Sequence, residues 1–404
     1  MPMTYEQLRD ALKGERLPAA FVDLDAFDRN LDVHLEMLRG RGTPLRIASK
    51  SLRVAPLLRR LTERGGDALR GVLCFSVAEA AFLGTQGFDD FLVAYPTVQV
   101  SDLETAARMT ADGRTIAVTA DSEQGVQRIA AVGQRHSIRL KVVLCIDMSF
   151  RPLGGRVHLG VRRSPLHSKE DVLELAGQVG RTPGVVFHGL MGYEAQIAGL
   201  QDDNPFDRKM NGLKAYVKKL SVAEVRERRA DIVHHLTKHG LPPTIVNGGG
   251  VGSLDTTTAE TGVTEVTAGS GFFKPHLFDY YRAPHMHRLE PSAFFALEIT
   301  RRPTPRMVTC LGGGYVASGP PGWDKIPRPW RPEGLQLTEA EACGEVQTPL
   351  SVPAGLSLTL GEPIVFRHAK GGELMERFNE VLLLRQGRVI DRVPTYRGQG
   401  LCFL

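Results

Sequence analysis

The feature that most constrains the fold is an alternation of two kinds of segment that repeats between residues 45 and 269. Short apolar runs rich in β-branched residues are separated by longer segments whose apolar residues lie three and four positions apart. Several of the longer segments end near glycine, as amphipathic helices often do. The apolar runs occupy residues 45–50, 71–76, 90–95, 115–120, 141–147, 184–190, 243–249 and 263–269, and clear helical spacing occurs in 54–65, 77–87 and 123–135.

Eight such units within about 250 residues match the size of a (β/α)8 barrel of the TIM type. The apolar runs are nearly continuous, which is typical of parallel strands covered by helices on the outside. An open, doubly wound sheet is the alternative that this pattern leaves. The segment 204–236, which precedes the seventh run, is long and charged, and it predicts one long helix or two consecutive exposed helices.

The pattern changes near residue 285, where β-rich stretches separated by turn residues replace the alternation. These stretches predict a second, mainly antiparallel β domain, so the predicted fold class is α/β, a barrel with an added β domain. We expect a barrel unit over 21–284 and a β-rich unit made of 1–20 plus 285–404. The β-rich stretches are 294–303, 306–314, 356–367 and 380–396.

Charge and cysteine content narrow the possible partners. The 50 basic and 45 acidic residues of the 404-residue chain are mixed along it, so the net charge of +5 forms no concentrated footprint for nucleic acid. No apolar stretch has the length of a signal peptide or a membrane span, which predicts a cytoplasmic protein without a membrane partner. The cysteines suit reduced packing thiols better than disulfides or a zinc site. They are Cys74, Cys145, Cys310, Cys343 and Cys402.

Polar residues that follow the apolar runs are candidates for chemistry, because the active face of such a barrel lies where its strands end. Lys50 directly follows the first run. An amine at a barrel mouth can lose its charge through desolvation or a neighbouring cation and attack a carbonyl, as a Schiff-base lysine must. A solvated lysine that ends a strand is the alternative for this residue taken alone.

Two glycine-rich loops follow the seventh and eighth runs, NGGGVGSL at 247–254 and AGSGFF at 268–273. Glycines let backbone N–H groups approach an anion closely, and Ser253 and Ser270 offer hydroxyl donors. Phosphate sites of TIM-type barrels commonly lie after strands 7 and 8. The pair of loops therefore predicts phosphate binding.

Three other segments have competing interpretations. HGLMGYEAQ, after the sixth run, contains Tyr193 and His188, which either face a ring or substrate or only pack. GGGYVA at 312–317 has the form of a dinucleotide fingerprint, but the proline-rich residues after it cannot begin the required helix. The loop 318–334, with both tryptophans, either covers a site or touches a second subunit, or is a plain surface loop.

The strand-end lysine, the GYE segment, the NGGG loop and the trailing β domain together resemble the pyridoxal-phosphate (PLP) enzymes of alanine-racemase fold. Within them the chain is most similar to the D-threonine aldolase and D-serine dehydratase family. The resemblance spans nearly the whole chain through the order of its motifs, and it implies PLP as the cofactor with Lys50 as its Schiff-base lysine. The cofactor-binding residues that it implies are Lys50, Tyr193, Asn247, Gly249, Gly250, Gly252, Ser253, Gly269, Ser270, Arg156 and His158.

Two departures from the family's pattern affect the expected chemistry. The family draws a metal site from a His-x-Cys or His-x-Asp pair, whereas here His368 is followed by Lys370, and a protonated lysine has no lone pair to offer a metal. Lys370 either replaces the divalent metal with its own charge, which we favour, or His368 keeps a metal with other ligands. A third alternative is that both residues only pair with nearby acids. The family's arginine before a Gly-Val pair falls on His158, with Arg156 and Arg162 nearby.

The resemblance implies a lyase that acts on a β-hydroxy amino acid of D configuration, with Lys50, Tyr193, His368 and Lys370 as its catalytic residues. The reaction is either retro-aldol cleavage or dehydration with deamination. An amino-acid racemase and a non-catalytic PLP-binding protein are the alternatives. A racemase of this fold usually brings a tyrosine from the β domain of the partner chain as its second base, so a tyrosine such as Tyr315 opposite Lys50 would favour the racemase. The resemblance also implies a homodimer.

Overall fold

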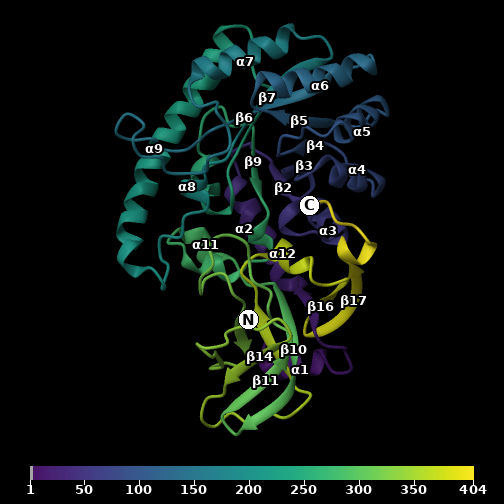
Figure 1. The fold of residues 1–404 in the computed structure, drawn as a ribbon, viewed down its shortest axis with the longest axis vertical. Helices are drawn as coiled ribbons and strands as arrows, with labels where there is room; N and C mark the ends of the chain where they lie inside the picture. The colour runs from purple at the N-terminus through teal and green to yellow at the C-terminus, as the bar shows by residue number, and fades with distance from the viewer. Residues whose placement is uncertain (1–2) are drawn as a thin grey trace.

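The computed structural model describes residues 3–404, and within them it contains a closed barrel of eight parallel strands (Figure 1). Each strand pairs with its neighbour in chain order, and β2 pairs with β9 to close the ring. The predicted fold class is confirmed, and each apolar run of the sequence overlaps one barrel strand. The strands are β2 (Leu45–Ala48), β3 (Leu69–Cys74), β4 (Phe91–Val93), β5 (Ile116–Ala120), β6 (Leu140–Ile146), β7 (Val185–Gly192), β8 (Ile245–Gly248) and β9 (Glu265–Ala268).

Helices surround the barrel and bury one apolar face each against it. In α6, for example, Ser122 caps the first turn by accepting a hydrogen bond from Gly125 N at 3.3 Å, and Val126 and Ile129 are buried. The charged segment before the seventh strand forms one long helix, α9, the first of the two alternatives. The helices of this part are α2 (Leu24–Leu38), α3 (Ala55–Gly65), α4 (Val77–Thr85), α5 (Val100–Ala111), α6 (Glu123–Arg135), α7 (Lys169–Arg181), α8 (Ala195–Ala198), α9 (Arg208–Lys238), α10 (Leu254–Thr257) and α11 (Pro284–Arg288).

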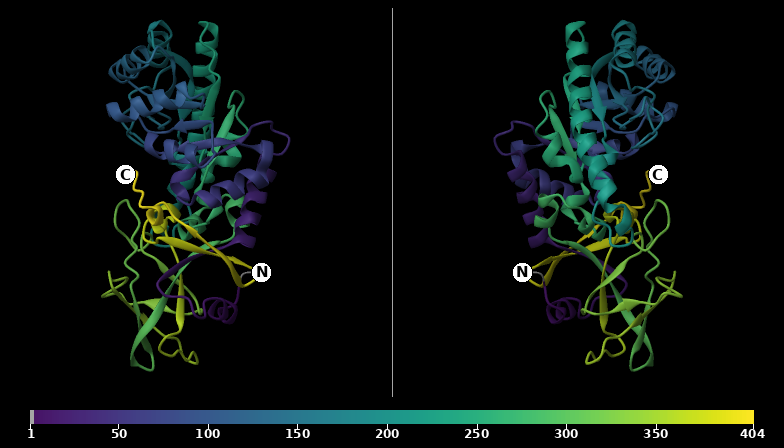
Figure 2. Two further views of the ribbon diagram at one scale, coloured as in Figure 1. Left: turned by 90° about the vertical axis from the view of Figure 1, so that its right-hand side faces the viewer. Right: turned by 90° about the vertical axis from the view of Figure 1, so that its left-hand side faces the viewer.

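The C-terminal third forms a nine-stranded, mainly antiparallel sheet, which lies beneath the barrel in both side views (Figure 2). Its first strand comes from the start of the chain: β1 pairs antiparallel with β10 and parallel with β16. The strands are β1 (Ala19–Asp23), β10 (Ala293–Thr304), β11 (Met307–Leu311), β12 (Arg328–Arg331), β13 (Gln336–Leu337), β14 (Gln347–Ser351), β15 (Pro363–Arg367), β16 (Glu380–Arg385) and β17 (Arg388–Pro394), with the helices α1 (Tyr5–Ala11) and α12 (Gly371–Met375).

The division of the chain into 21–284 and 1–20 plus 285–404 stays a prediction. Residues 21–23 belong to β1 and pair within the second sheet, whereas the barrel strands lie between Leu45 and Ala268. Phe294 of β10 stacks on Phe21 of β1, with ring centroids 5.3 Å apart, so the start of the chain is packed into this sheet. The chain thus enters through the second sheet, builds the barrel and returns to the sheet.

A buried ion pair crosses the seam at which the barrel closes. Arg46 on β2 donates to both carboxylate oxygens of Glu265 on β9, at 2.7 and 2.8 Å, and both side chains have no exposed surface. Asp90 accepts from the same guanidinium at 3.2 Å, and Asn247 Nδ2 donates to Glu265 at 2.8 Å. Buried charges require this degree of pairing, because removing them from water is costly.

The seam also sets the position of the residues that follow it. Four residues after Arg46 comes Lys50, and five residues after Glu265 comes Ser270, whose hydroxyl donates to Ser51 Oγ at 2.9 Å. A side chain at Gly269 would lie 2.6 Å from Ala48 O, so only glycine permits this approach of the two strand ends. The lysine and the last glycine-rich loop are therefore neighbours because β2 and β9 pair.

Membrane insertion by a helix has no support in the described part of the chain. None of the helices within residues 3–404 combines the length and the apolar character needed to cross a bilayer. The long helix α9 carries many charged residues along its length.

We expect Glu265→Gln to lower the free energy of unfolding by about 3 kcal/mol, because it leaves the buried Arg46 charge without its main partner. Urea unfolding followed by circular dichroism measures this loss. The matched control is Glu36→Gln, which breaks the exposed pair between Glu36 and Arg288 and should cost less than about 1 kcal/mol. Equal losses in the two variants would contradict a structural role for the seam.

Candidate active site

A cavity of about 1180 Å³ opens at the end of the barrel where the strands finish. Its lining combines residues from the barrel loops with residues from the second sheet's loops. Lys50, Tyr193 and Asn247 come from the barrel, and Ser318 and Lys370 come from the C-terminal part. Sequence positions more than 300 residues apart therefore share one chamber, as expected at the carboxyl ends of barrel strands.

Lys50 lies in the 3₁₀ turn that directly follows β2 and faces the cavity. Its Nζ donates to Tyr95 Oη at 2.6 Å. Tyr95 follows β4 and was not singled out from the sequence, although it is the last residue of the predicted strand 90–95. Any aromatic residue at a strand end can simply pack, so only the fold reveals that this hydroxyl meets the lysine amine.

The two glycine-rich loops lie side by side at the cavity. Gly249, Gly250, Gly269 and Ser270 line it. A side chain at Gly250 would lie 2.9 Å from Ala198 Cβ, and Gly249 has a φ of +92°, so glycine is required at both positions. The loops therefore form a backbone cradle with a serine hydroxyl, the kind of donor set that an anionic group needs.

Gly252 and Ser253 lie behind this cradle and do not line the cavity. Ser253 is buried and donates to Glu194 Oε1 at 2.7 Å. The space at Gly252 is also filled, because a side chain there would meet Ala198 O at 2.5 Å. Asn247 faces the cavity, but its amide donates to Thr267 Oγ1 and to Glu265. These residues shape and support the loops from beneath.

Tyr193 follows β7 and forms one wall of the cavity. Burial, and then the charge of Glu194, raise the pKa of its phenol to about 12, so the ring stays neutral at physiological pH. Glu194 is fully buried and joins Arg229 Nη2 at 2.8 Å, besides the hydroxyl of Ser253. The acid that follows Tyr193 thus ties its loop to the glycine-rich loop, a role for the GYE segment that sequence spacing did not reveal.

The segment between β6 and α7 places a different arginine at the cavity from those considered in the sequence. Arg156 and Arg162 are exposed, His158 bonds to Val161 O at 3.1 Å, and none of the three lines the cavity. Arg163 does line it, and its guanidinium lies over the Tyr193 ring, 6.0 Å from the centroid. The segment has no regular secondary structure, so its sequence has no periodicity that could predict which arginine faces the cavity.

His188 lies away from the mouth. It occupies the middle of β7, where burial, followed by the charge of Lys141, lowers the pKa of its ring. Asp90 and Glu265, which lie at the start of the strands, are also among its charged neighbours. His188 is therefore part of the polar filling of the barrel and does not face the cavity.

His368 and Lys370 follow β15 and have different surroundings. His368 is buried, packs edge-on against Phe273 and does not line the cavity. Burial and the neighbouring His276 lower the pKa of its ring to about 3, so it is neutral. Lys370 faces the cavity and donates to Ser318 O at 2.9 Å and to Ser318 Oγ at 2.7 Å.

The residues present do not fit a divalent metal at this place. Within residues 3–404, no group of three or more His, Cys, Asp or Glu side chains is arranged to hold a metal ion. The Lys370 ammonium lies 3.4 Å from Glu373. Its positive charge would repel a divalent metal ion bound at the same place. This wall of the cavity thus carries an ammonium group of its own, paired with the carboxylate of Glu373.

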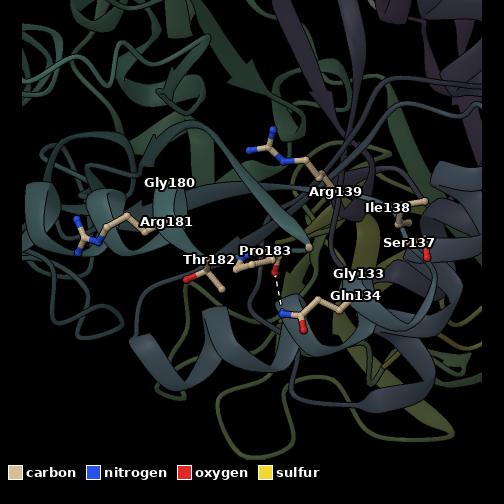
Figure 3. Close-up of a pocket in the computed structure, with 10 residues that line it drawn as sticks. Gly133, Gln134, Ser137, Ile138, Arg139, Gly180, Arg181, Thr182 and Pro183 are labelled. Carbon is tan, nitrogen blue, oxygen red and sulfur yellow. Dashed lines mark hydrogen bonds between the residues drawn. The ribbon is translucent and has the colours of Figure 1, made fainter.

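A second cavity, of about 570 Å³, lies at the opposite end of the barrel (Figure 3). It is formed where α6 and α7 end, near Gly133 and Arg181, and where β7 is about to begin at Gly184. Gln134 Nε2 donates to Pro183 O across it at 2.9 Å. The N-terminal end of barrel strands serves stability, and none of the predicted site residues lies here.

Comparison with known proteins agrees with this architecture. The family model described as "Alanine racemase, N-terminal domain" matches residues 22–243. A 3-hydroxy-D-aspartate aldolase of Paracoccus denitrificans (strain Pd 1222) is 27% identical over 236 residues, which are 58% of this chain and 54% of the relative. The chain thus spans about half the length of the curated relative that it matches.

Two solved structures share the fold over nearly the whole chain. A D-threonine aldolase from Filomicrobium marinum has a TM-score of 0.78 and 21% identity, covering 96% of this chain and 97% of the other. A D-threo-3-hydroxyaspartate dehydratase from Delftia sp. HT23 has a TM-score of 0.75 and 18% identity, covering 95% and 98%. Since the family model matches more than half of its residues, the chain belongs to the family of the alanine racemase N-terminal domain.

Proposed function

We propose that this protein is a PLP-dependent lyase that acts on a β-hydroxy amino acid of D configuration, by retro-aldol cleavage or by dehydration with deamination. The observation that carries the proposal is the shared cavity: Lys50, the paired glycine-rich loops and the Lys370 wall enclose one chamber. The proteins similar to this chain that are named as aldolases and a dehydratase of hydroxy amino acids add support.

The residues around the cavity fit PLP. Lys50 would hold the cofactor covalently, and Gly249, Gly250, Gly269 and Ser270 would hold its phosphate. Tyr193 would face the ring as a neutral aromatic wall. PLP, when bound, accepts the electron pair that remains when a bond to the substrate's α-carbon breaks.

Lys50 and Tyr95 supply the proton chemistry on the barrel side. Once its amine is released by the substrate, Lys50 takes a proton from the α-carbon for dehydration or from the β-hydroxyl for retro-aldol cleavage. Tyr95 Oη, 2.6 Å from Nζ, holds the amine in position and can pass a proton to or from it. Both groups lie within the same chamber as the proposed substrate.

Lys370 supplies positive charge on the opposite wall. An ammonium has three N–H groups: two bond to Ser318, and the third lies towards Glu373, 3.4 Å away, which a ligand oxygen would have to replace. We propose that this N–H polarises the substrate's β-oxygen, the task that a metal performs in other enzymes by Lewis-acid chemistry. His368 is buried two residues before Lys370.

An amino-acid racemase is the second candidate. It would need a tyrosine brought from the β domain of a partner chain to the cavity. In its own chain Tyr315 packs edge-on against Phe295 and Phe378, with ring centroids 5.0 and 5.5 Å away. We retain the lyase because the similar proteins named above are aldolases and a dehydratase.

Assembly and location complete the proposal. We propose a homodimer, as the resemblance implies, in which the exposed apolar side chains at the start of α9 contact a second copy. Met210, Leu213 and Tyr216 are 41, 53 and 60% exposed and lie on successive turns. A cytoplasmic location agrees with the five cysteines, which are all free thiols.

Lys50→Ala should abolish turnover of β-hydroxy amino acids while leaving the fold intact, because the covalent anchor and the proton-transfer group are lost together. The unaltered protein with PLP should show a visible absorption band that borohydride removes. Peptide mapping should then find the reduced PLP adduct on Lys50. Circular dichroism checks folding of the variant. Substantial residual turnover by the variant, or a reduced PLP adduct on another lysine of the unaltered protein, would overturn the proposal.

Lys370→Met should lower kcat/KM by about a hundredfold, because it removes the charge that faces the β-oxygen. Chelators should change the activity of the unaltered enzyme by less than about twofold. The control is Lys325→Met: Lys325 lines the same cavity but is paired with Asp324 at 2.6 Å, so its loss should matter little. Inhibition by chelators with recovery on adding metal would contradict the role of Lys370.

A further inference from the structure

Two lysines of the cavity, Lys50 and Lys370, are carried by segments that touch each other directly. Lys50 lies in the turn Ser49–Ser51, here called the lysine turn, and Lys370 is the N-cap residue of α12. A side chain at Gly372 would lie 1.8 Å from Lys50 O, so the backbone of α12 packs against the carbonyl group of the lysine itself. The barrel wall and the second sheet's wall of the chamber therefore meet at the lysine turn.

Arg53 is the polar link between the two segments. Its Nε donates to Lys50 O at 3.2 Å, and its Nη1 donates to Glu376 Oε1 at 2.8 Å. The guanidinium lies over the Phe75 ring, 5.1 Å from the centroid. The side chains of Arg53 and Glu376 are only 12 and 18% exposed. Because a guanidinium is planar and its N–H groups point in fixed directions, these contacts hold it in one orientation.

The backbone of Arg53 is constrained as well. Its φ of +54° lies in the left-handed region, which a residue other than glycine adopts only when its surroundings hold it there. Arg53 N donates to Ser49 O at 3.0 Å, and Arg53 O accepts from Tyr396 N at 3.0 Å. The arginine is therefore fixed to the lysine turn through its main chain and reaches α12 with its side chain.

Glu376, the other half of the pair, belongs to the element that carries Lys370. Lys370 is the N-cap and Glu376 the C-cap of α12, a helix of 5 residues. Leu374 N donates to Lys370 O at 3.2 Å, which closes the turn between these two ends. A helix this short moves as one body, so a displacement of Glu376 also displaces Lys370.

A second arginine approaches the same carboxylate and provides a comparison. Arg397 comes from the C-terminal segment, with its Nη2 3.8 Å from Glu376 Oε2 and half of its side chain exposed. An ion pair of that length and exposure contributes little. Arg53, not Arg397, is therefore the main partner of Glu376.

We propose that Arg53 and Glu376 are positioning residues that set the separation between Lys50 and Lys370 across the cavity. The inference rests on the proposed function, in which Lys50 transfers a proton and Lys370 polarises the β-oxygen of the same substrate molecule. These two acts must occur together, and a misplacement of about 1 Å in such a site costs up to about a hundredfold in rate. A reaction that needs Lys50 alone does not depend on the pair.

The first test compares two reactions in Glu376→Met, which breaks the link to α12 and leaves Arg53 bonded to Lys50 O. For a β-hydroxy amino acid, kcat should fall about ten- to fiftyfold with KM changed less than about twofold. Exchange of the α-proton of D-alanine with D2O, followed by proton NMR, should stay within about threefold, because D-alanine has no β-hydroxyl for Lys370 to polarise. The matched control Arg397→Met should leave both rates within about twofold.

The second test places Glu376→Met in the Lys370→Met background. Because the pair acts through Lys370, the added substitution should cost less than about a further twofold in kcat. Hydrogen exchange by mass spectrometry gives a readout that does not depend on activity. In the protein without added cofactor, Glu376→Met should speed amide exchange in residues 49–54 and 371–377 together by about tenfold, and Arg397→Met should not.

The outcomes separate this inference from the proposed function. If the unaltered protein with PLP shows neither turnover nor a reduced adduct on Lys50, the proposed function fails. If it is active but Glu376→Met slows both reactions equally, raises KM with kcat unchanged, or costs its full loss again in the Lys370→Met background, the positioning role is wrong. Should Glu376→Met fail to fold, Glu376→Gln, which keeps the shape and removes the charge, should show the same split between the two reactions.

Discussion

The closing seam of the barrel is the constraint on which the rest of the structure depends. Parallel strands can form a ring only if the first and last pair, and here that pair carries the fully buried Arg46 and Glu265. Inside the barrel these two side chains form a bidentate ion pair in place of apolar contacts. The geometry of that pair specifies one register between β2 and β9. Lys50 and Ser270 follow these two residues by a few positions, so the register of the seam also sets the distance between the lysine and the last glycine-rich loop.

A second buried network holds the opposite side of that loop pair. Glu194 joins Arg229 of α9 to Ser253 and Thr257, which follow β8. The long helix is thus connected to the cavity through buried charges, and Arg229 also donates to the carbonyl of Gly192, which lines the cavity. Tyr193 precedes Glu194 directly, so the aromatic wall and the glycine-rich cradle are positioned by one carboxylate. Rigid support of this kind is what a cavity needs to hold a ligand in one orientation.

The sequence predicted most of the architecture because its signals are periodic. Eight apolar runs and the helices between them indicate a barrel, and a barrel implies that Lys50 and both glycine-rich loops lie at one end. Irregular segments carry no such signal. Arg163, not Arg156 or His158, reaches the cavity, since the path of the loop after β6 depends on contacts with distant residues. Tyr95 was visible as a strand-end residue, but its partner was not.

The fold class, the order of the strands and the residues that end them follow from hydrophobic period and chain direction, which can be read from the amino-acid sequence. Which of these end residues meet depends on packing between distant parts of the chain. Lys370 and Ser318 come from loops of the second sheet, and their contact with the chamber depends on how that sheet docks beneath the barrel. Local sequence pattern does not encode how two distant parts of the chain dock.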